Sequence, residues 1–351
     1  MATVFKTFLN NDATSTRTML HESVPITGSI ISCTYADSNI KNYTHGLFQS
    51  VYDYPYLSSS ANHIFDITCG YANTSPLSAS ATADGVAASD IKDKIMMYNQ
   101  MAQVLAGHDV NGNILEFDQD GNISAGGTKL DAVYVLNFAR LLAKDEIKKG
   151  SFTLQLATGS TNSPVDFTPA DLLTVSDYGA LNDYRVNSPA AEYGILYTSS
   201  ADIAADGTSG VGLLYYQAGI AILTASVFDQ SQFYSSGDTY SASLSASSIE
   251  TNADGVRNRM YNVEFNNTTE LNSSIYFCRV NHNEYNYSAN PTYLSSSKIV
   301  VKEQTTDAPV SYVTTVGLYS ADNELLAVAK LSEPLKKDPN NELILRVRLD
   351  Y

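Results

Sequence analysis

The last nine residues of the chain alternate with a period of two. Over Leu343–Tyr351, one set of alternate positions is apolar or aromatic, and the other set carries Ile344, Arg346, Arg348 and Asp350. Successive side chains of a β-strand point to opposite faces of a sheet. The pattern therefore predicts a strand with one buried and one exposed face.

Two longer segments predict β-hairpins. Ser311–Tyr319 and Glu324–Leu331 flank the residues Ser-Ala-Asp-Asn, while Val211–Tyr216 and Ile220–Thr224 flank Gln-Ala-Gly. Asp, Asn and Gly accept the left-handed backbone conformations that tight turns need. A further strand is predicted over Ser273–Val280.

Helices are predicted at few places. Asp90–Ala106 carries apolar residues at helical spacing, with Ser89 as the predicted cap and Gly107 as the terminator. Leu130–Lys149 is ambiguous, because Ala132–Phe138 suits a strand as well as a helix. Residues 139–149, which follow Ala132–Phe138, favour a helix.

Stretches rich in Ser, Ala and Thr predict loops over Thr74–Ser89, Ser199–Gly210 and Ser231–Asp254. Thr168–Asp171 predicts the start of a short helix, because proline suits the first helical position. Together these patterns predict a mainly β chain with a few helices, an α+β protein whose antiparallel sheets form sandwich- or barrel-like domains with a helical insertion. The predicted parts are an N-terminal β region (1–85), a helix-containing insertion (86–150), a β region with low-complexity loops (151–262) and a C-terminal β region (263–351).

The negative net charge of the chain disfavours polyanionic partners. The 351 residues include 21 Lys and Arg against 37 Asp and Glu, a net charge of -16. Nucleic-acid binding needs clustered cations, so neither nucleic acid nor an anionic membrane is a predicted partner. The start of the chain lacks the apolar core of a signal peptide, and Cys33, Cys69 and Cys278 are widely spaced. Synthesis in a reducing cytoplasm is therefore expected.

Signatures of common enzymes are absent from the sequence, which has no GxxxxGK[ST], GxGxxG, HExxH or GxSxG. A zinc site that draws on His45, His63, Cys69 and Cys278 is conceivable, since ligands converge in space. Isolated histidines and buried thiols explain the same residues more simply. The sequence therefore predicts no catalytic residues, no metal and no cofactor.

Two acidic turns partly resemble a calcium loop. Counted from Asp109, Ile114 stands where the template needs glycine, and Asp120 stands where it needs a bidentate Glu. Turns at Asn111–Asn113 and Asp120–Asn122 around a short strand, residues 114–117, are the favoured interpretation. Glycoside hydrolysis by paired acids is a minor alternative. The acid pairs considered are Asp118 with Asp120 and Asp183 with Glu192.

Tyrosine is the compositional oddity, with 24 Tyr, 12 Phe and no Trp. Tyrosine combines a large contact area with a hydrogen-bonding tip and suits protein interfaces, although high strand propensity also explains its abundance. The residues predicted to lie in an interface are Tyr43, Phe48, Tyr52, Tyr54, Tyr56, Tyr285, Tyr287, Tyr293, Arg346, Arg348 and Tyr351.

Several segments resemble virion structural proteins of tailed bacteriophages, including large contractile-tailed and marine ones. The segments that carry the resemblance are Asn39–Phe48, Tyr52–Asn62, Asp145–Gly150, Gly212–Gly219, Glu284–Thr292 and Tyr312–Tyr319 with Glu324–Leu331. The resemblance implies a non-enzymatic component present in many copies. The tail or baseplate is the first expected location, and the neck or capsid surface is the next.

Such a component is expected to bind other virion proteins and to form a homo-oligomer, and its expected location is the virion after synthesis in the host cytoplasm. The C-terminal strand either closes a sheet of its own chain or adds to a neighbouring subunit. Two alternatives remain open at this point. One is a glycan- or receptor-binding tail module, and the other is a polysaccharide-degrading tail enzyme.

Overall fold

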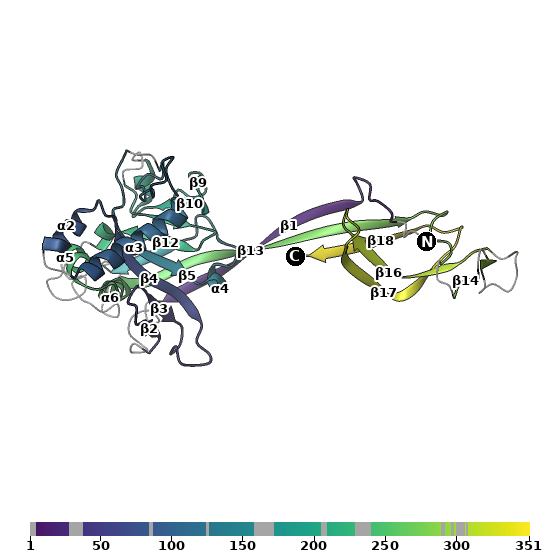
Figure 1. Cartoon of the computed structure of the whole chain (residues 1–351), viewed down its shortest axis with the longest axis horizontal. Coiled ribbons are helices and arrows are strands. Elements are labelled where there is room, and N and C mark those ends of the chain that lie inside the picture. The colour runs from purple at the N-terminus through teal and green to yellow at the C-terminus, as the bar shows by residue number, and fades with distance from the viewer. Residues whose placement is uncertain are drawn as a thin grey trace. The chain divides into compact units, whose positions relative to one another are not determined.

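The computed structural model describes residues 5–27, 38–83, 87–123, 126–157, 172–204, 209–228, 240–288, 292–295, 298–299, 306 and 308–351. Cys33 and the predicted helix start at Thr168–Asp171 lie outside these residues. The chain is mainly β with a few helices and antiparallel sheets, as predicted. It folds into two compact units (Figure 1): unit 1 comprises residues 1–19 and 270–351, and unit 2 comprises residues 20–269.

Unit 2 contains an eight-stranded antiparallel sheet. Its strands are β2 (Ile40–Asn42), β3 (Gln49–Tyr52), β4 (His63–Tyr71), β5 (Ala132–Phe138), β9 (Arg185–Ser188), β10 (Ala191–Leu196), β11 (Gly212–Tyr215) and β12 (Ile220–Thr224). They follow one another in the order β2-β3-β4-β5-β12-β11-β10-β9. The predicted hairpin over 211–224 is confirmed, because β11 pairs with β12 and Gly219 has the positive φ of 69° that the turn needs.

Strand β5 is buried on both of its faces. Tyr134 and Leu136 face one hydrophobic core, and Val133 and Val135 face a second. A strand buried on both sides reads as a continuous apolar run. This explains why the sequence of β5 was ambiguous between strand and helix.

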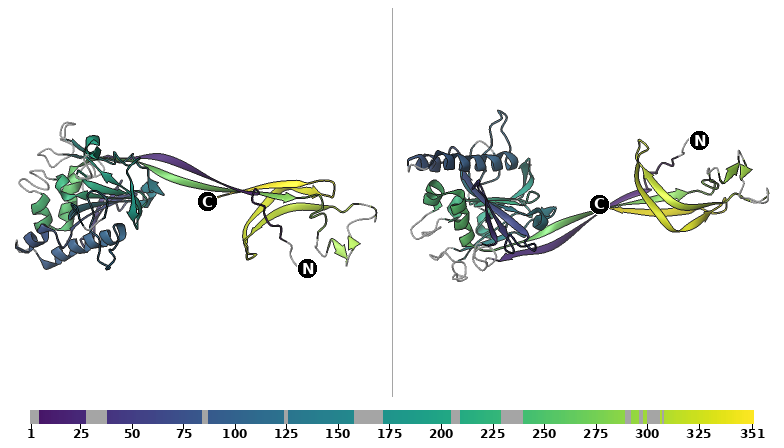
Figure 2. Two further views of the ribbon diagram at one scale, coloured as in Figure 1. Left: turned by 90° about the horizontal axis from the view of Figure 1, so that it is seen from above. Right: turned by 60° about the horizontal axis from the view of Figure 1, so that its bottom comes forward.

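Helix α3 (Ala88–Leu105) covers the face of the sheet that Val133 and Val135 occupy (Figure 2). Its buried residues include Tyr98, Ala102 and Leu105, in agreement with the predicted stripe. The predicted cap was wrong, because the helix begins after Ala87 and has no side-chain cap.

The other core lies between the eight-stranded sheet and a second sheet, which contains β6 (Glu146–Ile147), β7 (Thr153–Ala157), β8 (Leu172–Ser176) and the first part of β13 (Met260–Val280). Phe138 of β5 lies 6.1 Å from Phe152 and 5.1 Å from Phe265 of β13, between ring centroids. Edge-to-face rings of this kind pack favourably. β13 contributes residues to both units and crosses the boundary predicted at 262 without a break.

Several local predictions need correction. Helices α2 (Pro76–Ala83), α5 (Tyr240–Ala246) and α6 (Ile249–Arg259) and the 3-10 turn η3 (Ser200–Ala204) occupy parts of the stretches predicted as loops. Residues 114–117 form no strand and have only isolated bridges beside them. The helix predicted after residue 138 is the single turn α4 (Arg140–Ala143), and a second 3-10 turn is η4 (Ala225–Phe228). None of the helices in the described ranges is long and apolar enough to cross a membrane.

Unit 1 is built from strands. Its hairpin consists of β16 (Ser311–Tyr319) and β17 (Leu325–Lys337), with Asn323 at a positive φ of 63° in the turn, so this prediction is confirmed. β18 (Leu343–Asp350) pairs with residues 273–280 of β13, which means that the C-terminal strand closes a sheet of its own chain. The remaining strands are β1 (Ala13–Thr27), which pairs with β13, and the short pair β14 (Leu294–Ser295) and β15 (Lys298–Ile299).

Candidate interaction surfaces

The first group of tyrosines belongs to unit 2 and packs mainly against itself. Tyr43 stacks on His45 with 5.2 Å between ring centroids and lies 4.8 Å from Phe48, while the Lys41 ammonium sits 4.7 Å above the Tyr43 ring. All of these side chains except His45 are half-buried. The turn after β2 is therefore a small aromatic core of its own, stabilised by stacking and a cation–π contact.

Tyr52 joins this group from β3. Its ring lies 6.4 Å from Tyr56 and 5.5 Å from His63, and burial, followed by the neighbouring Tyr43, raises its pKa. Tyr54 and Tyr56 are the exposed members. The structure thus brings Tyr43, Phe48, Tyr52 and Tyr56 together, and Tyr54 and Tyr56 are exposed.

A chain of polar contacts runs beneath this group. The Ser50 hydroxyl donates to Asp66 Oδ1, and His63 Nε2 lies 2.8 Å from the same oxygen. A histidine that activates a serine nucleophile must stand between the serine and the acid. Here the carboxylate stands between them, so the contacts are those of a structural network.

The acids considered from the sequence are held by local contacts: the Asp120 amide donates to Asp118 Oδ1 at 3.1 Å, and Arg185 donates to the Asp120 carbonyl at 3.4 Å. Asp118 is buried against Lys129, and burial raises the pKa of its carboxyl, whereas Asp183 pairs with Arg185 and Glu192 with Lys149. Asp109 accepts hydrogen bonds from the backbone of Asn111 and Asn113 at 2.8 Å each, as in an Asx turn. Among the described residues, no three His, Cys, Asp or Glu side chains converge as a metal site.

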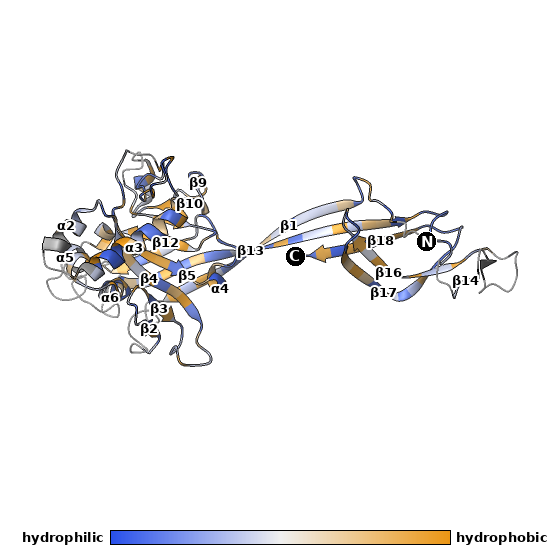
Figure 3. Ribbon diagram, in the orientation of Figure 1, coloured by the Kyte–Doolittle hydropathy of each residue, from blue (hydrophilic) through white to orange (hydrophobic). Residues whose placement is uncertain are grey.

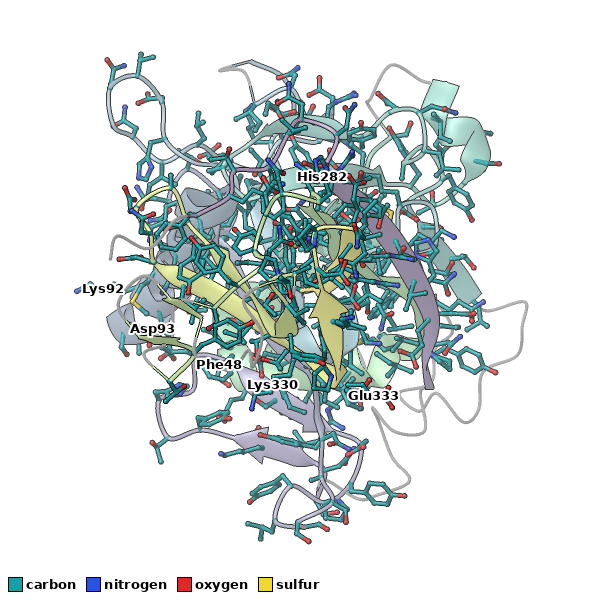
Figure 4. All side chains as sticks on the ribbon, turned by 90° about the vertical axis from the view of Figure 1, so that its right-hand side faces the viewer. Phe48, Lys92, Asp93, His282, Lys330 and Glu333 are labelled. Atoms are coloured by element: carbon teal, nitrogen blue, oxygen red, sulfur yellow. The ribbon has the colours of Figure 1, made fainter. Side chains whose placement is uncertain are left out.

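Two hollows on unit 2 involve α3. A shallow groove of about 550 Å³ is lined by Asn73, Lys92, Ile95, Met96, Asn99, Gln100 and Gln103. A smaller one of about 100 Å³ includes Asp93 and Lys94 in its wall, and Figure 4 labels Lys92 and Asp93. Lys94 is buried, which lowers its pKa, and its ammonium donates to the carbonyls of Leu244 and Ser247 at 2.7 and 2.6 Å. It thereby joins α3 to the end of α5.

The second group of tyrosines belongs to unit 1 and is displayed to solvent. Tyr285 and Tyr287 are exposed, on a loop that follows β13. Tyr285 has a positive φ of 52°, which is a strained conformation for a bulky residue, and its carbonyl accepts a hydrogen bond from the Ser311 hydroxyl. Tyr293 is half-buried, and its hydroxyl donates to the carbonyl of Val310.

A buried lysine holds this loop. The ammonium of Lys337, which is 0 % exposed, donates to the carbonyls of His282 and Asp338 at 3.1 and 2.7 Å and to Asn286 Oδ1 at 2.6 Å. Three acceptors match the three donors of an ammonium group. Tyr285 and Tyr287 are therefore presented by a pre-organised loop, which lowers the entropy cost of binding a partner.

Replacing Lys337 by methionine is expected to loosen the tyrosine loop, residues 281–287. The apolar side chain removes the Lys337 donor from three acceptors, of which the His282 carbonyl keeps the Asn286 side-chain amide, so amide hydrogen exchange of peptides over 281–287 should become at least about tenfold faster. Lys336→Met is the matched control, because the Lys336 side chain is 55 % exposed. Equal exchange in both variants would contradict the role of Lys337.

The C-terminal strand presents its charged residues outward, as predicted. Arg346 and Arg348 are exposed, while Val347 between them is buried. Arg348 pairs with Asp350 at 2.7 Å and reaches the Ser273 hydroxyl at 3.1 Å. Tyr351 is exposed, and its backbone pairs with that of Asn272. Arg346, Arg348 and Asp350 form one charged face of β18.

The two units differ sharply in where their apolar side chains lie. Of the 53 buried apolar residues in the described ranges, 51 belong to unit 2, and only Leu318 and Val347 belong to unit 1. Unit 1 nevertheless exposes 14 large apolar or aromatic side chains, one more than unit 2. Figure 3 shows apolar positions along β16, β17 and β18. Unit 1 is therefore a β unit with a poorly filled core and an apolar surface.

Sequence reasoning missed the most apolar part of that surface. Phe5, Tyr319, Leu325, Leu326 and Val328 are all exposed, and we call them the hairpin patch. The sequence signal was present at residues 325–329, where the apolar run Leu-Leu-Ala-Val-Ala breaks the alternation of a half-buried strand.

Comparison with known proteins identifies no relative of this chain: no family model, no curated protein and no solved structure matches it. Its function is therefore argued from the surfaces just described.

Proposed function

We propose that this chain is a non-enzymatic structural component of a tailed-bacteriophage particle. The tail or baseplate is the preferred location, and the neck or capsid surface is the alternative. The observation that carries the proposal is the reversed distribution of apolar side chains in unit 1, where 14 are exposed and two are buried among the described residues. A surface of this kind gains stability when a partner removes it from water.

The chemistry of the described sites supports a structural role. The Ser50–Asp66–His63 contacts lack the order of a catalytic triad, and the acids considered from the sequence form ion pairs or turns. Pre-organised, exposed tyrosines on the 281–287 loop have the properties of interface anchors. The resemblance of many segments to virion proteins supports the same assignment.

Association with particles tests the proposal. Phage particles that carry the gene of this chain are purified on a density gradient. The chain, detected by its peptides, should sediment with the particles in a constant ratio to the most abundant particle protein. A constant ratio is expected because a structural component is present in a fixed number of copies. Recovery of the chain only in the soluble fractions would contradict the proposal. A soluble cytoplasmic protein of the host serves as the control for trapping.

A further inference from the structure

Four residues of the hairpin patch are connected at the turn end of the β16–β17 hairpin, and the fifth, Leu326, falls at a register shift of the hairpin. The rings of Phe5 and Tyr319 lie 4.7 Å apart between centroids. A Cβ atom added at Gly317 would meet Tyr319 at 2.9 Å and Leu325 at 3.3 Å, so both side chains lie over this glycine. Val328 pairs with Gly317 across the hairpin. Because Gly317 has no side chain, the Tyr319 ring and the Leu325 side chain pack directly over its backbone.

Charge is distributed unevenly between the units. Unit 1 contains 10 Lys and Arg and 11 Asp and Glu, a net charge of -1, whereas unit 2 contains 11 and 26, a net charge of -15. Two copies of unit 1 therefore meet without net repulsion, while unit 2 of one copy repels unit 2 of another. Any pairing of identical chains is favoured at unit 1.

We infer that a second copy of this chain docks on the hairpin patch, unit 1 against unit 1. This inference deepens the proposed function, on which it rests, by naming the partner of one assembly surface. The patch supplies exposed apolar area, and strand β17 also carries Lys330 and Glu333 (labelled in Figure 4), one exposed charge of each sign. A self-complementary interface repeats each contact about its two-fold axis, so it needs both signs on one surface.

The open edge of β18 is a poorer site for a second copy. Among the described strands, β18 pairs only with β13. Antiparallel addition of an identical strand, centred on Val347, would set Arg346 of one copy opposite Arg348 of the other. Like charges directly opposite destabilise a strand pair, and charged edges are a common protection against edge-to-edge association. The face of the hairpin is therefore the favoured contact.

Sedimentation velocity of the full chain tests the inference. From about 0.5 to about 50 μM, the wild type should form a discrete oligomer by mass action. Val328→Lys and Leu326→Lys should each weaken association at least about tenfold, because a cation must be desolvated in the contact. Val186→Lys is the matched control, since Val186 is also an exposed strand valine but lies in unit 2. Unchanged amide hydrogen exchange over the β16–β17 hairpin would show that unit 1 of the variants folds.

Two results would overturn the inference: a monomeric wild type at the highest concentration, or lysine variants that associate as the wild type does. Raising NaCl from about 0.05 M to about 0.5 M should strengthen association, because salt screens the repulsion between acidic units. Weakening by salt would show that ion pairs carry the contact and would count against the patch. A monomer that still sediments with particles refutes only this inference, whereas loss from the particles refutes the proposed function.

Discussion

Gly70→Ala is expected to lower the free energy of unfolding of unit 2 by about 3 kcal/mol or more. Gly70 lies on β4, and a Cβ atom there would fall 2.4 Å from the carbonyl oxygen of Lys94 and 2.9 Å from the backbone nitrogen of Tyr98. Both atoms belong to the backbone of α3 and cannot turn aside as a side chain can. The helix must therefore move away from the sheet, and its contacts with β4 and β5 are lost.

Urea unfolding followed by circular dichroism measures this effect. Gly126→Ala is the matched control, because a Cβ atom at Gly126 has nothing within 4 Å. The control should unfold at nearly the wild-type urea concentration. If Gly70→Ala unfolded together with the control, the close approach of α3 to β4 would be wrong.

Lowering the pH from about 7.5 to about 4.5 is expected to stabilise the wild type over Asp177→Asn by about 2 kcal/mol. Burial raises the pKa of the Asp177 carboxyl from its ordinary value of 3.8 to about 6. The hydrogen bonds that it accepts from the amides of Gly150 and Phe152 and from the Tyr216 hydroxyl only partly offset this burial. The folded state therefore binds the proton more tightly than the unfolded state.

The sign of the effect follows from that difference. Above about pH 6 the buried carboxylate is charged, and its desolvation costs stability; as the pH falls from about 6 towards 3.8, the folded chain takes up a proton first and becomes relatively more stable. Asparagine does not titrate, so the difference between wild type and variant removes the contribution of the other acids. A difference that stays constant across this pH range would show that Asp177 is not desolvated.

Local patterns in the sequence were sufficient to predict the strands that have one exposed face. β18 shows the predicted alternation, with Val347 buried and Arg346 and Arg348 exposed, because the pattern depends only on the pleat of the strand itself. The hairpins predicted at 211–224 and 311–331 were equally accessible, since their turns contain residues that accept positive φ. In each case, the information lies within about 20 consecutive residues.

The errors arose where low-complexity composition hid a periodic pattern. Helix α6 begins at the cap Ser248, whose hydroxyl accepts from the Thr251 amide at 3.2 Å, and it ends near Arg257 and Arg259. These are recognisable start and stop signals, but the start signal lies inside the serine-rich stretch Ser231–Asp254, whose composition predicts a loop. In contrast, residues 114–117 have turn signals at both ends, yet within the described residues the bridges at this segment are the isolated ones of His108 with Ile114 and of Asp118 with Lys129.

The apolar surface of unit 1 and the fixed tyrosine loop could not be predicted from local sequence patterns. Unit 1 combines residues 1–19 with residues 270–351, so its poor core becomes visible only when the partners of β13 and the hairpin are known. The tyrosine loop was identified as an interface candidate from composition, but its fixation by Lys337 depends on a contact between residues 51 to 55 positions apart. Long-range pairing of this kind depends on tertiary structure.

Unit 1 is built from two separate segments of the chain, and this affects the order in which the units fold during synthesis. Unit 2, residues 20–269, is complete in the nascent chain well before β18, residues 343–350, has been synthesised. Since domains fold as they emerge, the acidic unit 2 is expected to fold first, and residues 273–280 of β13 pair with β18 only after residues 343–350 have been synthesised. The hairpin patch is likewise completed only after unit 2 has been synthesised, so the proposed contact between copies would form after the acidic unit has folded.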